Sequence, residues 1–130
     1  DAGTLEPAGE IVSEGFPIRA TATPRGQVLV TRARAGDLAV YDAATFDEIR
    51  VITFDIASMD VEERLFADRF GDSSVPIGVI VDGGGQTAWV AHANADVITE
   101  IDLASGAITR MLRAGREPDG MGYSPLDVER

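Results

Sequence analysis

The chain has 130 residues, 45% of them hydrophobic, a size and composition that suit one folded domain with its own core. Its net charge of -11 and pI near 4.3 argue against a nucleic-acid-binding protein, because contacts to phosphate backbones reward a basic surface. The lack of cysteine excludes disulfides, thiol catalysis and cysteine-based zinc sites, and the single histidine, His92, argues against a histidine-based metal site or a catalytic triad.

The first elements along the chain are predicted to be short β-strands. Residues 10–13 are expected to form the outer strand of a preceding structural unit. Residues 27–31 follow a glycine turn and are rich in β-branched residues, which is typical of a β-hairpin. Further strands are predicted at 37–41 and 48–54, so that residues 16–54 form one unit of four antiparallel strands.

The next segment, residues 55–74, interrupts the strand pattern. Asp60 followed by Glu63 matches a helix capping box, and apolar residues recur on one side of the segment, so a short helix is predicted over 60–70. This apolar stripe consists of Val61, Leu65, Phe66 and Phe70. We expect the stripe either to cover its own unit or, because the strand units do not require a helix between them, to dock on a partner.

The residues that follow repeat the first unit. Pro17 matches Pro76, and Gly26 matches Gly85, both at an offset of 59. Residues 75–112 therefore predict a second unit of four strands. Four short antiparallel strands in about 42 residues are the length and content of a β-propeller blade.

The repeat continues beyond these matches. After one extra residue the offset becomes 60, as in Val30 and Val90, and a third copy of the first element begins at Pro118. Residues 116–125 are therefore expected to form the inner strand of a third blade. The predicted fold class is all-β, with two four-stranded antiparallel blades, this extra inner strand and one short helical insertion.

At these residues the chain resembles the YVTN family of β-propeller proteins (YncE-like). The second unit follows the family repeat closely at residues 76–81, 89–94 and 97–102, and the resemblance covers about residues 15–125. It implies a propeller fold and, because many family members are exported, a periplasmic or extracellular location. Since a propeller needs four or more blades to close, three arrangements are expected: a fragment of a longer propeller, an assembly such as three two-blade chains, or a reduced propeller packed on a larger complex.

Four polar residues in matching loops are candidate contacts to a ligand or partner. His92 and Asn94 follow the second strand of the second unit, and Arg32 and Arg34 occupy the same place in the first. Guanidinium groups suit carboxylates and phosphates, although each of these residues could equally be an ordinary surface or turn residue. Trp89 is expected in the core, with stacking on a sugar or quinone as the alternative.

No residue pattern names a reaction. The sequence therefore predicts a non-enzymatic, exported interaction protein without a catalytic, cofactor or metal site, which recognises a protein partner through its blade edges and its insertion. That partner is another copy of the chain or a larger complex. The alternatives are an accessory subunit of a periplasmic redox or electron-transfer complex and a lectin-like ligand-binding trimer. No apolar run approaches the roughly 20 residues of a membrane span.

Overall fold

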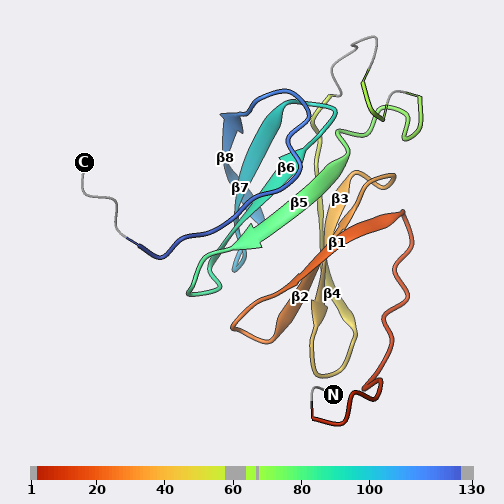
Figure 1. Ribbon diagram of the computed structural model, residues 1–130, viewed down its shortest axis with the longest axis vertical. Helices are drawn as coiled ribbons and strands as arrows, with labels where there is room; N and C mark the ends of the chain where they lie inside the picture. The colour runs from red at the N-terminus through yellow and green to blue at the C-terminus, as the bar shows by residue number, and fades with distance from the viewer. Residues whose placement is uncertain (1–2, 58–63, 67, 127–130) are drawn as a thin grey trace.

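In a computed structural model, which describes residues 3–57, 64–66 and 68–126, the chain forms two antiparallel sheets of four strands each (Figure 1). Each strand pairs with the next along the chain, so both sheets are simple meanders. The first sheet contains β1 (Pro17–Ala22), β2 (Gln27–Arg32), β3 (Asp37–Asp42) and β4 (Glu48–Thr53). The second sheet contains β5 (Pro76–Val81), β6 (Thr87–His92), β7 (Val97–Asp102) and β8 (Ala107–Arg113). These sheets confirm the predicted all-β class.

Equivalent turns connect the strands of the two sheets. Gly26 and Gly85 adopt positive φ angles of 74° and 67° in the first turn of each sheet, a conformation that glycine adopts without steric cost. In the last turn, the carboxylate of Asp42 accepts the backbone N–H of Thr45 at 2.9 Å, and that of Asp102 accepts the N–H of Ser105 at 2.7 Å. These local bonds fix the strand registers in both halves of the chain.

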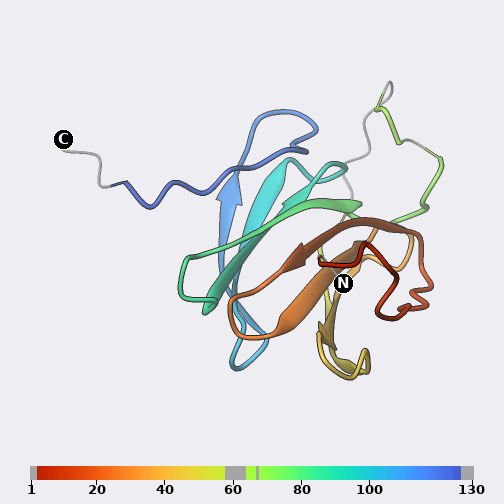
Figure 2. The ribbon, with the colours of Figure 1, turned by 60° about the horizontal axis from the view of Figure 1, so that its bottom comes forward.

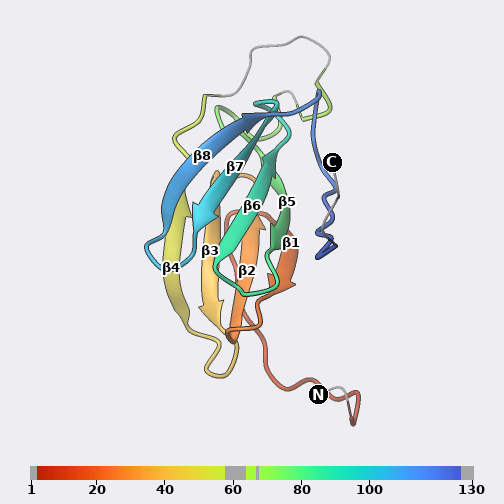
Figure 3. The ribbon, with the colours of Figure 1, turned by 90° about the vertical axis from the view of Figure 1, so that its left-hand side faces the viewer.

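The core lies between the two sheets, which stack face to face (Figure 3). Side chains alternate along each strand, so that every second residue points to the other sheet. The apolar residues at this contact are Leu29, Leu38, Val40, Ile52 and Phe54 of the first half and Val79, Ala88, Val90, Ile101 and Leu103 of the second. Burial of each leucine or isoleucine at such a contact contributes about 1.5–3 kcal/mol.

The predicted helical insertion is not seen. No helix forms in the part of the chain that the structure describes, so none is long and apolar enough to cross a membrane there. Residues 65–66 and 68–72 form turns and a bend, while residues 58–63 and 67, including Val61 of the predicted stripe, lie outside the described residues. Long-range anchors hold the described part: the Arg64 guanidinium binds the carboxylate of Asp96 at 2.7 Å, and Phe70 is buried in a second apolar cluster. In the described residues, these contacts to distant parts of the chain take the place of the helix that the spacing predicted.

The predicted inner strand of a third blade does not form, because residues 116–125 pair with no strand in the described structure. The segment nevertheless runs back along the β5 edge of the second sheet (Figure 3). The carbonyl oxygen of Asp119 lies so close to Gly78 on β5 that a side chain there would not fit. Glu117 has a positive φ of 51° directly before a proline, as do Phe16 (66°) and Val75 (54°) before β1 and β5. The third repeat thus keeps the backbone conformation of the first two at its start.

The chain before β1 also lacks the predicted strand at residues 10–13. Figure 2 shows this N-terminal segment against the first sheet. Ile11 packs on Val30, Ala39 and Tyr41, and the Tyr41 hydroxyl lies 3.1 Å from the Ser13 hydroxyl oxygen. The segment therefore covers the face of the first sheet that points away from the core.

Candidate functional site

The face of the second sheet that points away from the core, which we call the open face, carries an apolar hollow of about 430 Å³. The Trp89 ring stacks on the ring of Tyr123, with centroids 6.4 Å apart, and its indole N–H donates to the Glu100 carboxylate at 3.1 Å. The apolar side chains around the hollow are Ile80, Trp89, Ile98, Leu112, Met121 and Tyr123. A half-buried tryptophan inside an apolar rim is typical of protein-binding surfaces.

Strand alternation explains why Trp89 lies on the open face and not in the core, where the sequence analysis placed it. Its neighbours on β6, Ala88 and Val90, are both fully buried against the first sheet. A strand residue between two inward-facing residues must point outward. The open face was therefore not predicted from the sequence, because residues 88–90 are all apolar and show no alternation that would place Trp89 on either face.

The sequence-predicted residue His92 is fully buried at the end of β6. Its Nδ1 lies 2.9 Å from the Ser74 hydroxyl and its Nε2 lies 3.0 Å from the Thr99 hydroxyl. Burial lowers the pKa of His92 to about 4, because an imidazolium is poorly solvated there. The ring is thus neutral at physiological pH and is not presented to solvent.

Asn94 is also buried, in the turn between β6 and β7, where its backbone N–H donates to the carbonyl oxygen of Ser74 at 3.0 Å. Its side-chain Oδ1 has no hydrogen-bond partner among the described residues. Asp96 in the same turn binds Arg64, and the Arg64 hydrogen bonds lower the pKa of Asp96 to about 2. This ion pair, which the sequence analysis did not identify, ties the insertion to the second sheet.

The two predicted arginines face different partners. Arg32 binds both oxygens of Asp37 at 2.6 and 2.8 Å and an oxygen of Glu48 at 2.9 Å, and these bonds raise its pKa above the ordinary arginine value. Arg34 is exposed, and its guanidinium carbon lies 5.6 Å from the ring centroid of Phe16. The structure therefore does not bring the two guanidinium groups together on one anion.

The three described residues of the predicted stripe have different environments. Leu65 is 74% exposed, whereas Phe66 is half-buried and Phe70 is buried. The Phe70 ring contacts the rings of Phe66 and Phe16, with centroids 5.7 and 5.0 Å apart. Of the three described stripe residues, Phe66 and Phe70 thus pack on the chain itself and Leu65 does not.

Among the described residues, no three histidine or acidic side chains are grouped to hold a metal ion.

No family model and no curated protein matches the chain. Solved structures do: hydrazine synthase of Kuenenia stuttgartiensis aligns with 91% of this chain and 29% of its own, at a TM-score of 0.69 and 15% identity. The Cps50 (Swd1) β-propeller domain of Myceliophteria thermophila aligns with 85% of this chain and 30% of its own, at a TM-score of 0.63 and 15% identity.

A protein of unknown function from Bacteroides caccae aligns with 76% of this chain and 29% of its own, at a TM-score of 0.54 and 14% identity. The chain therefore spans about 30% of the length of these solved structures. At such low identity the likeness shows the fold, which is of the β-propeller type. Membership of the YVTN family in particular stays a prediction, because no family model matches.

Proposed function

We propose that this chain is a non-enzymatic, exported interaction scaffold whose open face binds the first sheet of a second copy of the chain. Propeller-type sheets suit this role, because each sheet buries its apolar faces against neighbours and an unmatched face is available to a partner. Here the partner sheet would cover the hollow around Trp89 and Leu112.

One observation carries this proposal: three apolar positions of the open face repeat positions that the first sheet already uses for packing, while Glu100 takes the place of the buried Val40. At an offset of 60, Leu29, Leu38 and Ile52 of the first sheet correspond to Trp89, Ile98 and Leu112 of the second. The first three are fully or almost fully buried against the second sheet. The open face therefore has the chemistry of a packing face.

The first sheet supplies the matching surface. Its outward residues Val28, Val30 and Tyr41 correspond at the same offset to Ala88, Val90 and Ile101, which the second sheet uses to pack on the first. A second copy could therefore stack on the open face as the second sheet stacks on the first. The N-terminal segment, which packs on this surface through Ile11, would move aside. Such head-to-tail contacts extend into rings or open chains.

The solution mass of the purified chain tests this proposal. Light scattering after size exclusion should give a multiple of 13.8 kDa for the unchanged chain and 13.8 kDa for Trp89→Asp, because a carboxylate on the open face opposes desolvation. Leu65→Asp is the matched control, since Leu65 is 74% exposed on the insertion, and its mass should equal that of the unchanged chain.

Other results would point elsewhere. If Leu65→Asp alone became monomeric, the insertion and not the open face would be the interface. If the unchanged chain stayed monomeric at about 100 µM, its dissociation constant for self-association would lie well above that concentration, which would contradict pairing between copies. A different partner protein would then remain as the occupant of the open face.

The non-enzymatic part of the proposal is supported by the surroundings of His92. Ser74 and His92 have the spacing of a nucleophile and its base, 2.9 Å. However, Ser74 is 1% exposed and the second ring nitrogen of His92 is held by Thr99, so a substrate carbonyl has no access to the Ser74 hydroxyl.

Export of the chain is supported by its resemblance to the YVTN family. Fractionation of the source cells tests this part of the proposal, and recovery of the chain in the cytosol would contradict it.

A further inference from the structure

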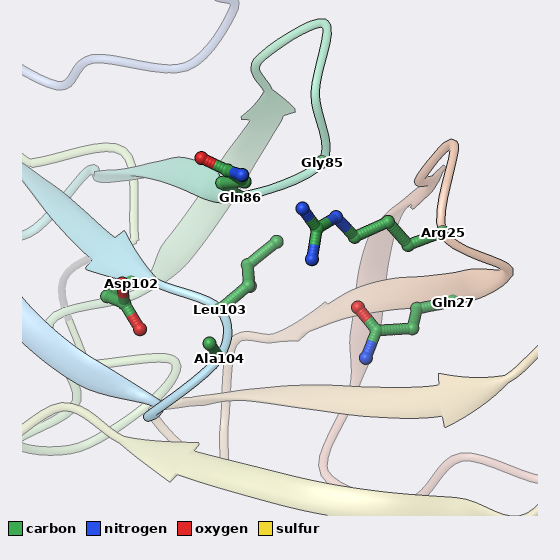
Figure 4. Close-up of a pocket in the computed structure, with 7 residues that line it drawn as sticks. All are labelled: Arg25, Gln27, Gly85, Gln86, Asp102, Leu103 and Ala104. Atoms are coloured by element: carbon green, nitrogen blue, oxygen red, sulfur yellow. The ribbon is translucent and has the colours of Figure 1, made fainter.

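A second cavity, of about 330 Å³, lies between turns of the two sheets, at the end of the molecule opposite the insertion (Figure 4). It takes residues from the β1–β2 turn of the first sheet and from the β5–β6 and β7–β8 turns of the second. Figure 4 shows polar side chains around an apolar centre: Arg25, Gln27, Gln86 and Asp102 surround Leu103 and Ala104.

Two arginines of the first sheet hold the walls of this cavity in place. The Arg25 Nε donates to the carbonyl oxygen of Gly84 at 2.9 Å. The Arg50 Nη1 donates to the carbonyl oxygens of Leu103 and Ala104 at 3.3 and 3.1 Å. The cavity is therefore bounded by turns that are fixed to one another across the sheets, which reduces the entropy lost when a ligand binds.

Several polar groups at the cavity are not engaged. Within the described part of the chain, the side-chain amides of Gln27 and Gln86 and the terminal nitrogens of Arg25 make no hydrogen bond. One oxygen of Asp102 accepts the N–H and the hydroxyl of Ser105, and these bonds lower the pKa of this carboxyl group. The cavity thus offers the two terminal nitrogens of the Arg25 guanidinium, two side-chain amides and one ionised carboxylate.

We propose that this cavity binds a small polyhydroxylated acid with a single carboxylate, such as a sugar acid. The Arg25 fork is suited to a carboxylate, and the amides of Gln27 and Gln86 can donate to or accept from hydroxyls. Asp102 accepts hydroxyl donors and repels a second negative charge, which disfavours dicarboxylates and phosphate dianions. The apolar surface of Leu103 and Ala104 faces the C–H groups of a sugar chain.

The side-chain amide signals of Gln27 and Gln86 in a ¹H–¹⁵N spectrum report directly on this site. Gluconate should shift both signals and saturate in the millimolar range. Glucitol lacks the carboxylate, hexanoate lacks the hydroxyls, and glucarate adds a second carboxylate. Each should bind at least about tenfold more weakly than gluconate, because glucitol loses the charge-assisted hydrogen bond to Arg25, hexanoate loses the hydrogen bonds of the hydroxyls, and the second carboxylate of glucarate is repelled by Asp102.

Arg25→Gln should raise the gluconate dissociation constant by at least about tenfold, and Gln27→Leu should raise it while leaving the charge of the site unchanged. Arg34→Gln is the matched control, because Arg34 is an exposed arginine at the other end of the sheets. Signal dispersion shows whether each variant is folded.

Equal gluconate affinity in folded Arg25→Gln would overturn the proposal, as would shifts that do not saturate or a hexanoate affinity equal to that of gluconate. This test is independent of the open face: Trp89→Asp should bind gluconate as the unchanged chain does.

Discussion

Acidification from about pH 7 to pH 4 is expected to lower the free energy of unfolding by roughly 3 kcal/mol through a single side chain, His92. Burial lowers the pKa of His92 from 6.5 to about 4 in the folded chain. Between these two values the unfolded chain binds more protons than the folded chain. The stabilisation by neutral His92 is therefore complete above pH 6.5 and is lost progressively as the pH falls to about 4.

The enclosure of His92 explains the size of this effect. The Ser74 and Thr99 hydroxyls bind its two ring nitrogens, and the Phe54 and His92 rings pack edge-to-face with their centroids 4.5 Å apart. The neutral ring donates one hydrogen bond and accepts the other. An imidazolium at this place would lose its hydration among apolar side chains of the core without gaining a carboxylate at either ring nitrogen.

Urea unfolding at a series of pH values tests this prediction. The unchanged chain should lose stability between pH 6.5 and 4, whereas His92→Asn should be less stable at pH 7 but nearly independent of pH in this window. Asp96 does not interfere, because its folded pKa of about 2 places its own contribution below about pH 4. An equal loss in both chains would show that other groups cause the acid sensitivity.

The sequence predicted the two sheets well because their determinants are local and repeated. Gly26 and Gly85 supply the positive φ angles of equivalent turns, and Asp42 and Asp102 close equivalent turns with their own carboxylates. Each signal depends on residues only a few positions away, so that the repeat could be recognised without knowing what lies opposite each strand.

The sequence did not reveal the path of the insertion, because long-range contacts decide it. The spacing of Leu65, Phe66 and Phe70 suits one side of a helix, yet Phe70 packs on Phe16, which is 54 residues earlier in the chain. The hydrophobic periodicity of a short segment is a weak signal when its apolar residues are anchored one at a time on different elements.

The candidate site was missed for a related reason. His92 was predicted in a loop because it follows the second predicted strand, and Trp89 in the core because it lies beside Val90. Their places follow instead from strand alternation and from which face of the sheet has a neighbour. The face of Trp89 is open because no further sheet covers it among the residues that the structure describes, and the sequence of β6 alone does not contain that information.

Replacement of Asp96 by alanine is expected to cost up to about 3 kcal/mol, because the Arg64 guanidinium would lose its two hydrogen bonds to the Asp96 carboxylate. The Arg64 side chain is 3% exposed and binds both Asp96 oxygens at 2.7 Å. Asp96 also accepts the backbone N–H of Glu117 at 2.9 Å. Its removal should therefore loosen the insertion and the C-terminal segment together, with faster proteolysis at residues 64–70 and 114–126.

The double variant Arg64→Met with Asp96→Ala separates these two effects. With the buried charge removed, much of the stability measured by urea unfolding should return, because an apolar side chain of similar length tolerates the enclosed position. The C-terminal segment should remain sensitive to protease, since Glu117 still lacks the Asp96 acceptor. If the double variant were as unstable as Asp96→Ala alone, the loss would come from the β6–β7 turn itself, and the Arg64–Asp96 pair would not be what holds the insertion on the second sheet.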